Sequence, residues 1–142
     1  MKITCDVLED ELLRKLDDLV DIQKIEKAVS RAALLVEAEA KKKAPRDNGD
    51  LARSITSKVE TSGNEVTGTV FTPLFYAPYV EYGTGLFAED GDGRKDVPWH
   101  YKDDKGDWHS TSGQKPQPFL RPALDENREQ VLRIIMEGLI DD

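Results

Sequence analysis

The sequence predicts an α+β domain in which helices from both ends of the chain pack on a small antiparallel sheet. Apolar residues recur at spacings of three and four between about residues 4 and 43, and again after residue 119, which is helical periodicity. Between residues 55 and 72 the period changes to two, as in strands. The prediction is an N-terminal helical pair and a C-terminal helix on this sheet, with an extended β-hairpin arm at residues 86–113.

Length and charge narrow the possible functions. The 142 residues fit a single domain with a real hydrophobic core. Lys and Arg total 20 against 28 Asp and Glu, a formal charge of -8, so no global field draws the chain toward nucleic acid or an anionic membrane. The acidic surface favours protein partners.

The cysteine count and the N-terminus indicate an intracellular origin. The single Cys5 excludes an internal disulfide and a multi-cysteine metal site. The chain starts without the apolar core of a signal peptide, and no apolar run approaches the roughly 20 residues that span a bilayer. We expect synthesis in the cytosol and no membrane contact.

The N-terminal periodicity predicts two helices, a short one and a longer one. Asp21 can cap the second helix, which places the break near residues 18–22. Cations suit the carboxyl end of a helix and Pro45 disfavours helical angles at the residue before it, so the second helix should end at residues 41–43. The apolar stripe consists of Leu8, Leu12, Leu16, Leu19, Ile22, Ile25, Val29, Ala32 and Val36.

A turn and a hairpin follow the helices. Asn48-Gly49 favours a left-handed bend that leads into residues 51–55. The β-rich runs at residues 55–61 and 65–72 flank a short glycine-containing turn at residues 62–64, which predicts an antiparallel hairpin.

An aromatic segment, residues 76–85, comes next. Pro78 near its start favours a helical turn over residues 76–82 rather than a central strand. Gly83-Thr84-Gly85 must then bend sharply, because glycine tolerates backbone angles that other residues avoid.

The arm is predicted to contain a small hairpin. Residues 97–102 and 107–111 flank a turn at 103–106, and they carry Trp99, Tyr101 and Trp108. Because a two-stranded hairpin is marginal in water, we expect the arm to become ordered against a neighbouring chain or a partner.

The C-terminal segment resumes the helical period. Its stripe consists of Leu120, Leu124, Val131, Ile134, Ile135 and Leu139. Pro122 is tolerable only in the first turn of this predicted helix.

No catalytic apparatus is visible, and we expect neither a cofactor nor a metal. The nucleophile-elbow, Walker and Rossmann patterns are absent. An enzymatic alternative is a small metal-dependent hydrolase: if His100 and His109 share a hairpin face, Asp107 or Glu89 completes a zinc or iron site. The acidic loops at residues 89–93 and 103–107 lack calcium-loop spacing.

Three arginines lie beside turns or helix starts. They can pair within the chain or reach a second subunit, because the planar guanidinium suits both roles. The arginines are Arg46, Arg53 and Arg121, and their candidate carboxylates are Asp50, Glu81 and Asp125.

The order of four motifs resembles the tail-completion family of long-tailed bacteriophages and prophages, which joins heads to tails at the neck. The motifs are Lys43-Ala44-Pro45, then residues 47–55, then residues 76–85, then residues 115–124. The likeness covers most of residues 20–140. The matching positions are Pro45, Gly49, Leu51, Ser54, Ile55, Tyr76, Ala77, Glu81, Gly83, Thr84, Gly85, Pro118, Phe119, Leu120 and Pro122.

The resemblance implies a non-enzymatic virion protein that assembles into a ring of six copies at the head–tail junction. It implies contacts with the head connector and with tail terminator or tube proteins, and DNA passing nearby without specific binding. A further alternative is a prophage-encoded module that binds a host protein. The predicted subunit and partner contacts are Tyr79, Glu81, Gly83, Thr84, Gly85, Trp99, Tyr101, Trp108, Pro118, Phe119 and Arg121.

Overall fold

The computed structural model describes residues 1–5, 22–46 and 49–140, which form two compact units. The first, which we call the helix–sheet unit, lies within residues 1–73 and 119–142; the second, the aromatic unit, comprises residues 74–118. The short first helix predicted before residue 22 lies outside the described residues.

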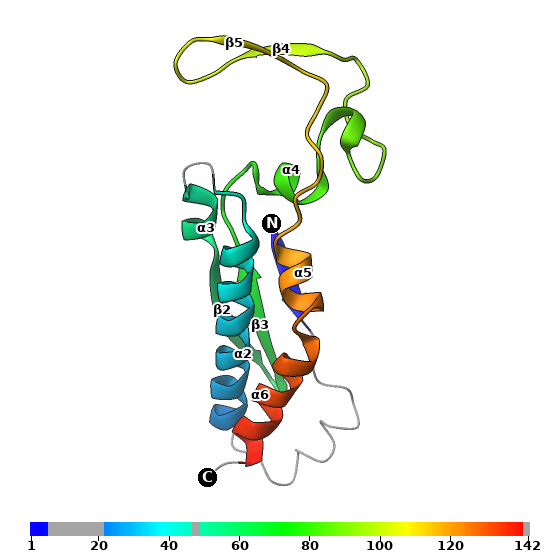
Figure 1. Ribbon diagram of the computed structural model, residues 1–142. Helices are drawn as coiled ribbons and strands as arrows, with labels where there is room; N and C mark the ends of the chain where they lie inside the picture. The colour runs from blue at the N-terminus through cyan, green and yellow to red at the C-terminus, as the bar shows by residue number, and fades with distance from the viewer. Residues whose placement is uncertain (6–21, 47–48, 141–142) are drawn as a thin grey trace. The chain divides into compact units, whose positions relative to one another are not determined.

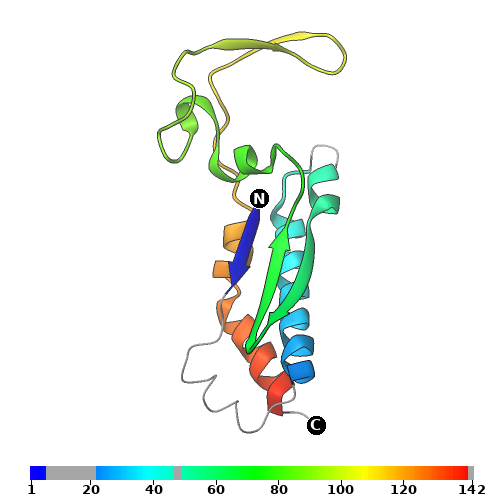
Figure 2. The same cartoon turned by 180° about the vertical axis from the view of Figure 1, so that it is seen from behind.

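The helix–sheet unit has two layers, with helices on one side of a three-stranded antiparallel sheet. Figure 1 views the helical side and Figure 2 the strand side. The sheet has the order β1-β3-β2, so β3 is central. The strands are β1 (Lys2–Cys5), β2 (Thr56–Ser62) and β3 (Glu65–Phe71); the helices are α2 (Ile22–Lys43), α3 (Asp50–Ser54), α5 (Leu120–Asp125) and α6 (Arg128–Ile140).

The long helix α2 organises this unit and confirms the predicted longer helix. It ends at the lysine triplet as expected, and it contacts β2, β3, α5 and α6. A Cβ added to Gly138 of α6 would lie 2.8 Å from the Cβ of Ala28. The two helices therefore approach closely because small residues face each other. The buried face of α2 consists of Ile25, Ala28, Val29, Ala32, Ala33, Val36 and Ala40.

Strand β1 corrects the prediction that helical structure begins at about Thr4. Thr4 and Cys5 pair with Thr69 and Gly68 of β3. This pairing joins residues more than sixty positions apart, which local periodicity cannot detect. Without β1, one edge of β3 would present unpaired backbone groups, and such an edge favours pairing.

The predicted hairpin is confirmed. Strands β2 and β3 pair antiparallel from Thr56↔Phe71 to Ser62↔Glu65, with Gly63 in the turn at a φ of 58°. The left-handed bend before residue 50 is also confirmed, because Gly49 has a φ of 79°. The short helix α3 that follows it was not predicted.

The C-terminal segment forms two helices, which corrects the prediction of one. Pro122 lies in the first turn of α5, as expected. The chain then turns at Asn127, whose side-chain Nδ2 donates to the Ala123 carbonyl at 2.8 Å, while the Asn127 carbonyl accepts from the Val131 amide at 2.9 Å. The asparagine thus ends one helix and starts the next, which Asn does more readily than it continues a helix.

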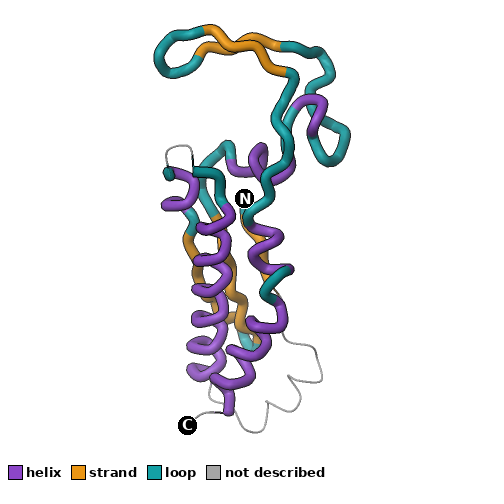
Figure 3. Tube along the Cα trace, in the orientation of Figure 1, coloured by secondary structure: helices purple, strands orange, loops and turns teal. Residues whose placement is uncertain are grey.

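The aromatic unit contains short elements connected by turns (Figure 3). They are α4 (Ala77–Tyr82), the 3-10 turn η1 (Gly85–Phe87), and the two-stranded sheet of β4 (Trp99–Lys102) and β5 (Trp108–Thr111). Pro78 is in the first turn of α4, so both the helical turn and the arm hairpin are confirmed. No helix in the described ranges is long and apolar enough to cross a membrane.

Candidate functional site

Two segments of the aromatic unit lie backbone to backbone around Gly85 and Gly113. We call this contact the backbone crossing. The Thr84 amide donates to the Gln114 carbonyl at 2.9 Å, and the Leu86 amide donates to the Ser112 carbonyl at 3.0 Å. Gly85 has a φ of 60°, and a Cβ there would lie 2.3 Å from the Ser112 carbonyl oxygen. Only glycine fits so close a backbone approach at this angle. The crossing holds the two ends of the predicted arm together.

The register of the arm hairpin places its side chains on two faces. Trp99 pairs with Thr111, and Tyr101 pairs with His109, while His100 pairs with Ser110. Neighbouring residues of a strand point to opposite faces, so His100 and His109 lie on opposite faces of this sheet. The site that the hydrolase alternative requires is therefore not formed, and the described residues contain no group of three metal-ligating side chains.

Asp103 stabilises the turn of this hairpin. Its Oδ1 accepts from the backbone amides of Lys105 and Asp107, each at 2.9 Å. His109 Nε2 donates to its Oδ2 at 2.8 Å, and the His109 ring stacks on Tyr101 with centroids 5.3 Å apart. The hydrogen bond from His109, followed by that from the Asp107 amide, lowers the pKa of the Asp103 carboxyl. The acidic turn is structural, as its sequence suggested.

The aromatic unit exposes large apolar side chains and buries almost none. Among the described residues, the only buried apolar side chain between positions 74 and 118 is Ala77. Trp108 is 68% exposed, and Lys102 covers its ring with Nζ 5.0 Å from the centroid. The exposed large apolar residues of the unit are Phe75, Tyr79, Leu86, Phe87, Tyr101 and Trp108. Large exposed apolar groups gathered in one unit are typical of interaction surfaces.

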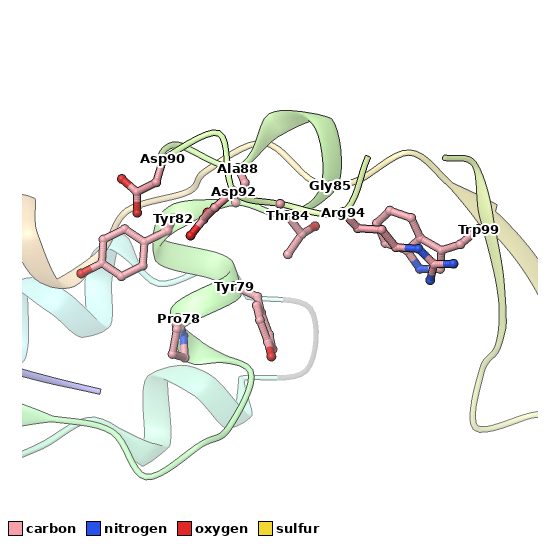
Figure 4. Close-up of a pocket in the computed structure, with 12 residues that line it drawn as sticks. Pro78, Tyr79, Tyr82, Thr84, Gly85, Ala88, Asp90, Asp92, Arg94 and Trp99 are labelled. Carbon is pink, nitrogen blue, oxygen red and sulfur yellow. The ribbon is translucent and has the colours of Figure 1, made fainter. Parts of the chain in front are cut away.

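A cavity of about 610 Å³ opens within the aromatic unit. In Figure 4 the Arg94 side chain lies against the Trp99 ring at one end of the view, and Asp90 and Tyr82 lie at the other. The Arg94 guanidinium is 5.2 Å from the Trp99 ring centroid and 3.3 Å from an Asp96 carboxylate oxygen. The lining residues are Pro78, Tyr79, Tyr82, Gly83, Thr84, Gly85, Ala88, Asp90, Asp92, Gly93, Arg94 and Trp99.

The structure brings five of the eleven predicted contact residues together around this cavity. These are Tyr79, Gly83, Thr84, Gly85 and Trp99. Tyr101 and Trp108 lie on the hairpin and are exposed, as is Pro118. Arg121 is half-buried, whereas Glu81 and Phe119 are completely buried.

Seven lining residues were not among the predicted contacts: Pro78, Tyr82, Ala88, Asp90, Asp92, Gly93 and Arg94. The sequence of residues 89–93 indicated an acidic turn, with Glu89 as a metal ligand in the hydrolase alternative. The proximity of this turn to the aromatic rings depends on the backbone crossing, and the paired glycines at positions 85 and 113 were the only sequence signal of that crossing.

One predicted arginine pairing is confirmed. Arg53 forms an ion pair with Asp50. Asp125 pairs with Arg128 at 3.0 Å, a pairing that was not predicted.

The exposed aromatic side chains of residues 74–118 are typical of proteins that bind other proteins. The model of the HK97-gp10-like family, assigned as a bacteriophage tail component, matches residues 10–83. This is just over half of the chain, and the protein belongs to this family. The match includes α2, the β2–β3 hairpin and α4, and it ends before the arm.

The predicted phage family is confirmed, and its members are structural tail components rather than enzymes. No curated protein and no solved structure matches the chain. The family match ends at residue 83, so the likeness of residues 84–140 stays a prediction.

Proposed function

We propose that this tail component acts at the head–tail junction, where it completes the tail by assembling into a ring of six copies. In this role it contacts the head connector on one side and tail terminator or tube proteins on the other. The observation that carries the proposal is the contrast within residues 74–118, which expose six large apolar side chains and bury only one apolar residue, Ala77.

A unit with so little buried apolar surface gains stability from contact with another chain. Its sheet has two strands of four residues each, and a sheet of this size is marginal in water. Aromatic residues are enriched in the centres of protein interfaces. Covering the exposed rings would therefore both order the arm and join subunits.

Charge supports a ring through which DNA passes without being held. With a formal charge of -8, the chain offers no excess of cations to displace counterions from phosphate. Weak attraction suits a conduit, because DNA must move through the neck.

The proposed contacts divide by accessibility. Tyr79, Tyr101, Trp108 and Pro118 are exposed, and Thr84, Trp99 and Arg121 are partly accessible. These seven are proposed as direct contacts. The other four predicted contacts are buried, and their proposed role is to hold the exposed contact residues in position: Glu81, Gly83, Gly85 and Phe119.

The test is the solution mass of the Trp99→Ala, Trp108→Ala double variant. We expect it to form smaller particles than the wild type at equal concentration, with the same helix content by circular dichroism. Leu132→Ala is the matched control, because Leu132 is 42% exposed but lies on α6, and its particles should keep the wild-type mass. An unchanged mass in the double variant would contradict the proposal.

Partner identity has a separate test. The chain should be captured by purified phage tails or connectors and not by host lysate. Capture by a host protein alone would favour the host-binding alternative.

A further inference from the structure

We infer that the cavity of the aromatic unit receives the hairpin tip of a second copy of this chain, with Lys102 and Trp108 entering it. This inference rests on the proposed self-assembly and specifies which two surfaces meet. The acceptor, the cavity, and the donor, the hairpin tip, are both within residues 74–118.

The acceptor combines aromatic walls with free negative charge. Tyr79, Tyr82 and Trp99 line it. Asp90 and Asp92 also line it, and neither carboxylate has an ion pair or a hydrogen bond within the described ranges. The one lining cation, Arg94, is already paired with Asp96. The cavity therefore favours an aromatic group that carries a positive charge.

The donor has this composition. Lys102 and Trp108 are directly opposite each other in the hairpin register, and the ammonium lies 5.0 Å from the indole centroid. Lys102 has no ion pair among the residues that the structure describes, and Trp108 is 68% exposed. On docking, the ammonium can reach the carboxylates while the indole packs against the tyrosines.

The tip of the same copy cannot reach the cavity, so a tip that occupies it belongs to another copy. Trp99 lines the cavity at the base of β4, and Lys102 is three residues further along the same strand, about 10 Å away at 3.3 Å per residue. A regular strand cannot fold back over that distance. The volume of about 610 Å³ is within the range of about 300–1,000 Å³ for pockets that enclose groups of this size.

Donor and acceptor are different surfaces of one chain, so the contact is heterologous. A heterologous contact generates a ring when the rotation between neighbours closes. The pairing of tip and cavity therefore accounts for a closed assembly, and it predicts that every copy uses both surfaces.

The experiment separates the two surfaces in two variants. The donor variant carries Lys102→Glu and Trp108→Ala, and the acceptor variant carries Asp90→Lys and Asp92→Lys. Each variant alone should be monomeric by light scattering under conditions in which the wild type assembles. Their equimolar mixture should form particles of twice the monomer mass and no larger, because only one intact contact remains.

Controls use exposed charges outside the proposed contact. Lys95→Glu matches the charge change of the donor variant, and Glu65→Lys combined with Glu137→Lys matches that of the acceptor variant; all three residues are exposed, outside the cavity lining and outside the arm hairpin. These variants should assemble as the wild type does. Hydrogen exchange over residues 74–118 should show that the donor and acceptor variants keep the fold of the unit.

Several outcomes would overturn the inference. If either variant alone assembles as the wild type does, or if the mixture stays monomeric or forms full rings, tip and cavity do not meet, while ring assembly itself stands. If the wild type never self-associates, both this contact and the proposed ring fail.

Disulfide trapping provides a second measurement that is independent of charge reversal. In a Cys5→Ser background, Lys102→Cys combined with Asp92→Cys should give covalent multimers on oxidation. Lys102→Cys combined with Lys95→Cys should not. Equal crosslinking in both would contradict the contact.

Discussion

The helix–sheet unit and the aromatic unit use their large side chains in opposite ways. The helix–sheet unit completely buries Ile55, Phe119, Leu120 and Ile135, whereas the aromatic unit leaves its rings on the surface. One unit is stabilised by a core and the other by backbone hydrogen bonds at a glycine crossing. The difference indicates that the core of the helix–sheet unit stabilises the fold, whereas the exposed rings of the aromatic unit can bind other chains.

The largest expected effect is in the core of the helix–sheet unit. Phe119 is completely buried, so Phe119→Ala removes its packing and leaves a cavity. We expect a loss of about 3–5 kcal/mol in the free energy of unfolding, measured by urea denaturation. Trp108→Ala, which removes a comparable but exposed ring, should change it by less than about 0.5 kcal/mol. Similar losses in both variants would show that the buried ring and the exposed ring contribute equally to stability, which contradicts the difference between the two units.

The next effect is local to the aromatic unit. Gly85→Ala forces a Cβ to within 2.3 Å of the Ser112 carbonyl oxygen, and overpacking of this kind costs about 1–3 kcal/mol. Hydrogen exchange should accelerate at Leu86 and Thr84, whose amides bond across the crossing, while α2 stays protected.

Gly91→Ala is the matched control for this substitution. Gly91 also has a positive φ, of 71°, but nothing lies within 4 Å of an added Cβ. It should show only the backbone strain of about 1–2 kcal/mol, without loss of protection at the crossing. Equal exchange in the two variants would show that the crossing is not what holds the unit together.

A smaller effect concerns the contact between α2 and β2. Ser57 Oγ donates to Glu37 Oε2 at 2.7 Å, and Lys41 Nζ donates to Glu37 Oε1 at 2.7 Å. Burial acts to raise the pKa of Glu37, but the bonds from Lys41 and Ser57 outweigh it, and the pKa is lowered from 4.5. A lowered carboxyl pKa stabilises the fold above the unfolded value and loses that contribution as pH falls through the folded value.

Ser57→Ala should therefore lower the free energy of unfolding by about 1–2 kcal/mol at pH 7. The cost should shrink as the pH falls below about 4.5, because the Glu37 carboxylate becomes protonated. Denaturation of both proteins across this pH range measures it. An equal cost at pH 3 and pH 7 would show that the charge of Glu37 is not involved.

The smallest effect is expected at an exposed ion pair. Lys42 Nζ lies 2.8 Å from Glu39 Oε1, and the Lys42 side chain is 68% exposed. Lys42→Ala should lower the free energy of unfolding by no more than about 0.3–0.5 kcal/mol. The loss should be the same whether or not the chain also carries Trp108→Ala. A loss above 1 kcal/mol in thermal unfolding would contradict this estimate.

Features that depend on neighbouring residues were predictable from the sequence. The end of α2 at Lys43, the turn at Gly63 and the helical turn after Tyr76 each follow from local backbone preferences. The strand β1 was missed because its four residues are defined by pairing with β3. The break at Asn127 was missed because the apolar spacing continues across it.

The sequence predicted aromatic residues of the candidate site, but it did not predict the charged residues that line the cavity. Trp99 and Tyr79 stood out by residue type. Asp90 and Asp92 become lining residues only because the chain folds back at Gly85 and Gly113, and such a backbone approach leaves no periodic pattern. The sequence singled out Tyr79, Tyr101 and Trp108, which are exposed, but not Phe75 or Phe87, which are exposed as well. The cavity beside these rings is known only from the structure.

The most direct test of the division between the two units is to remove the arm. The Leu86 amide lies 3.0 Å from the Ser112 carbonyl oxygen, so a two-glycine linker can replace residues 87–111. We expect this variant to remain monomeric by light scattering where the wild type assembles, and to unfold at the midpoint that the wild type shows when it is diluted to monomer. Wild-type assembly by the shortened chain, or unfolding of the helix–sheet unit with the arm, would contradict this expectation.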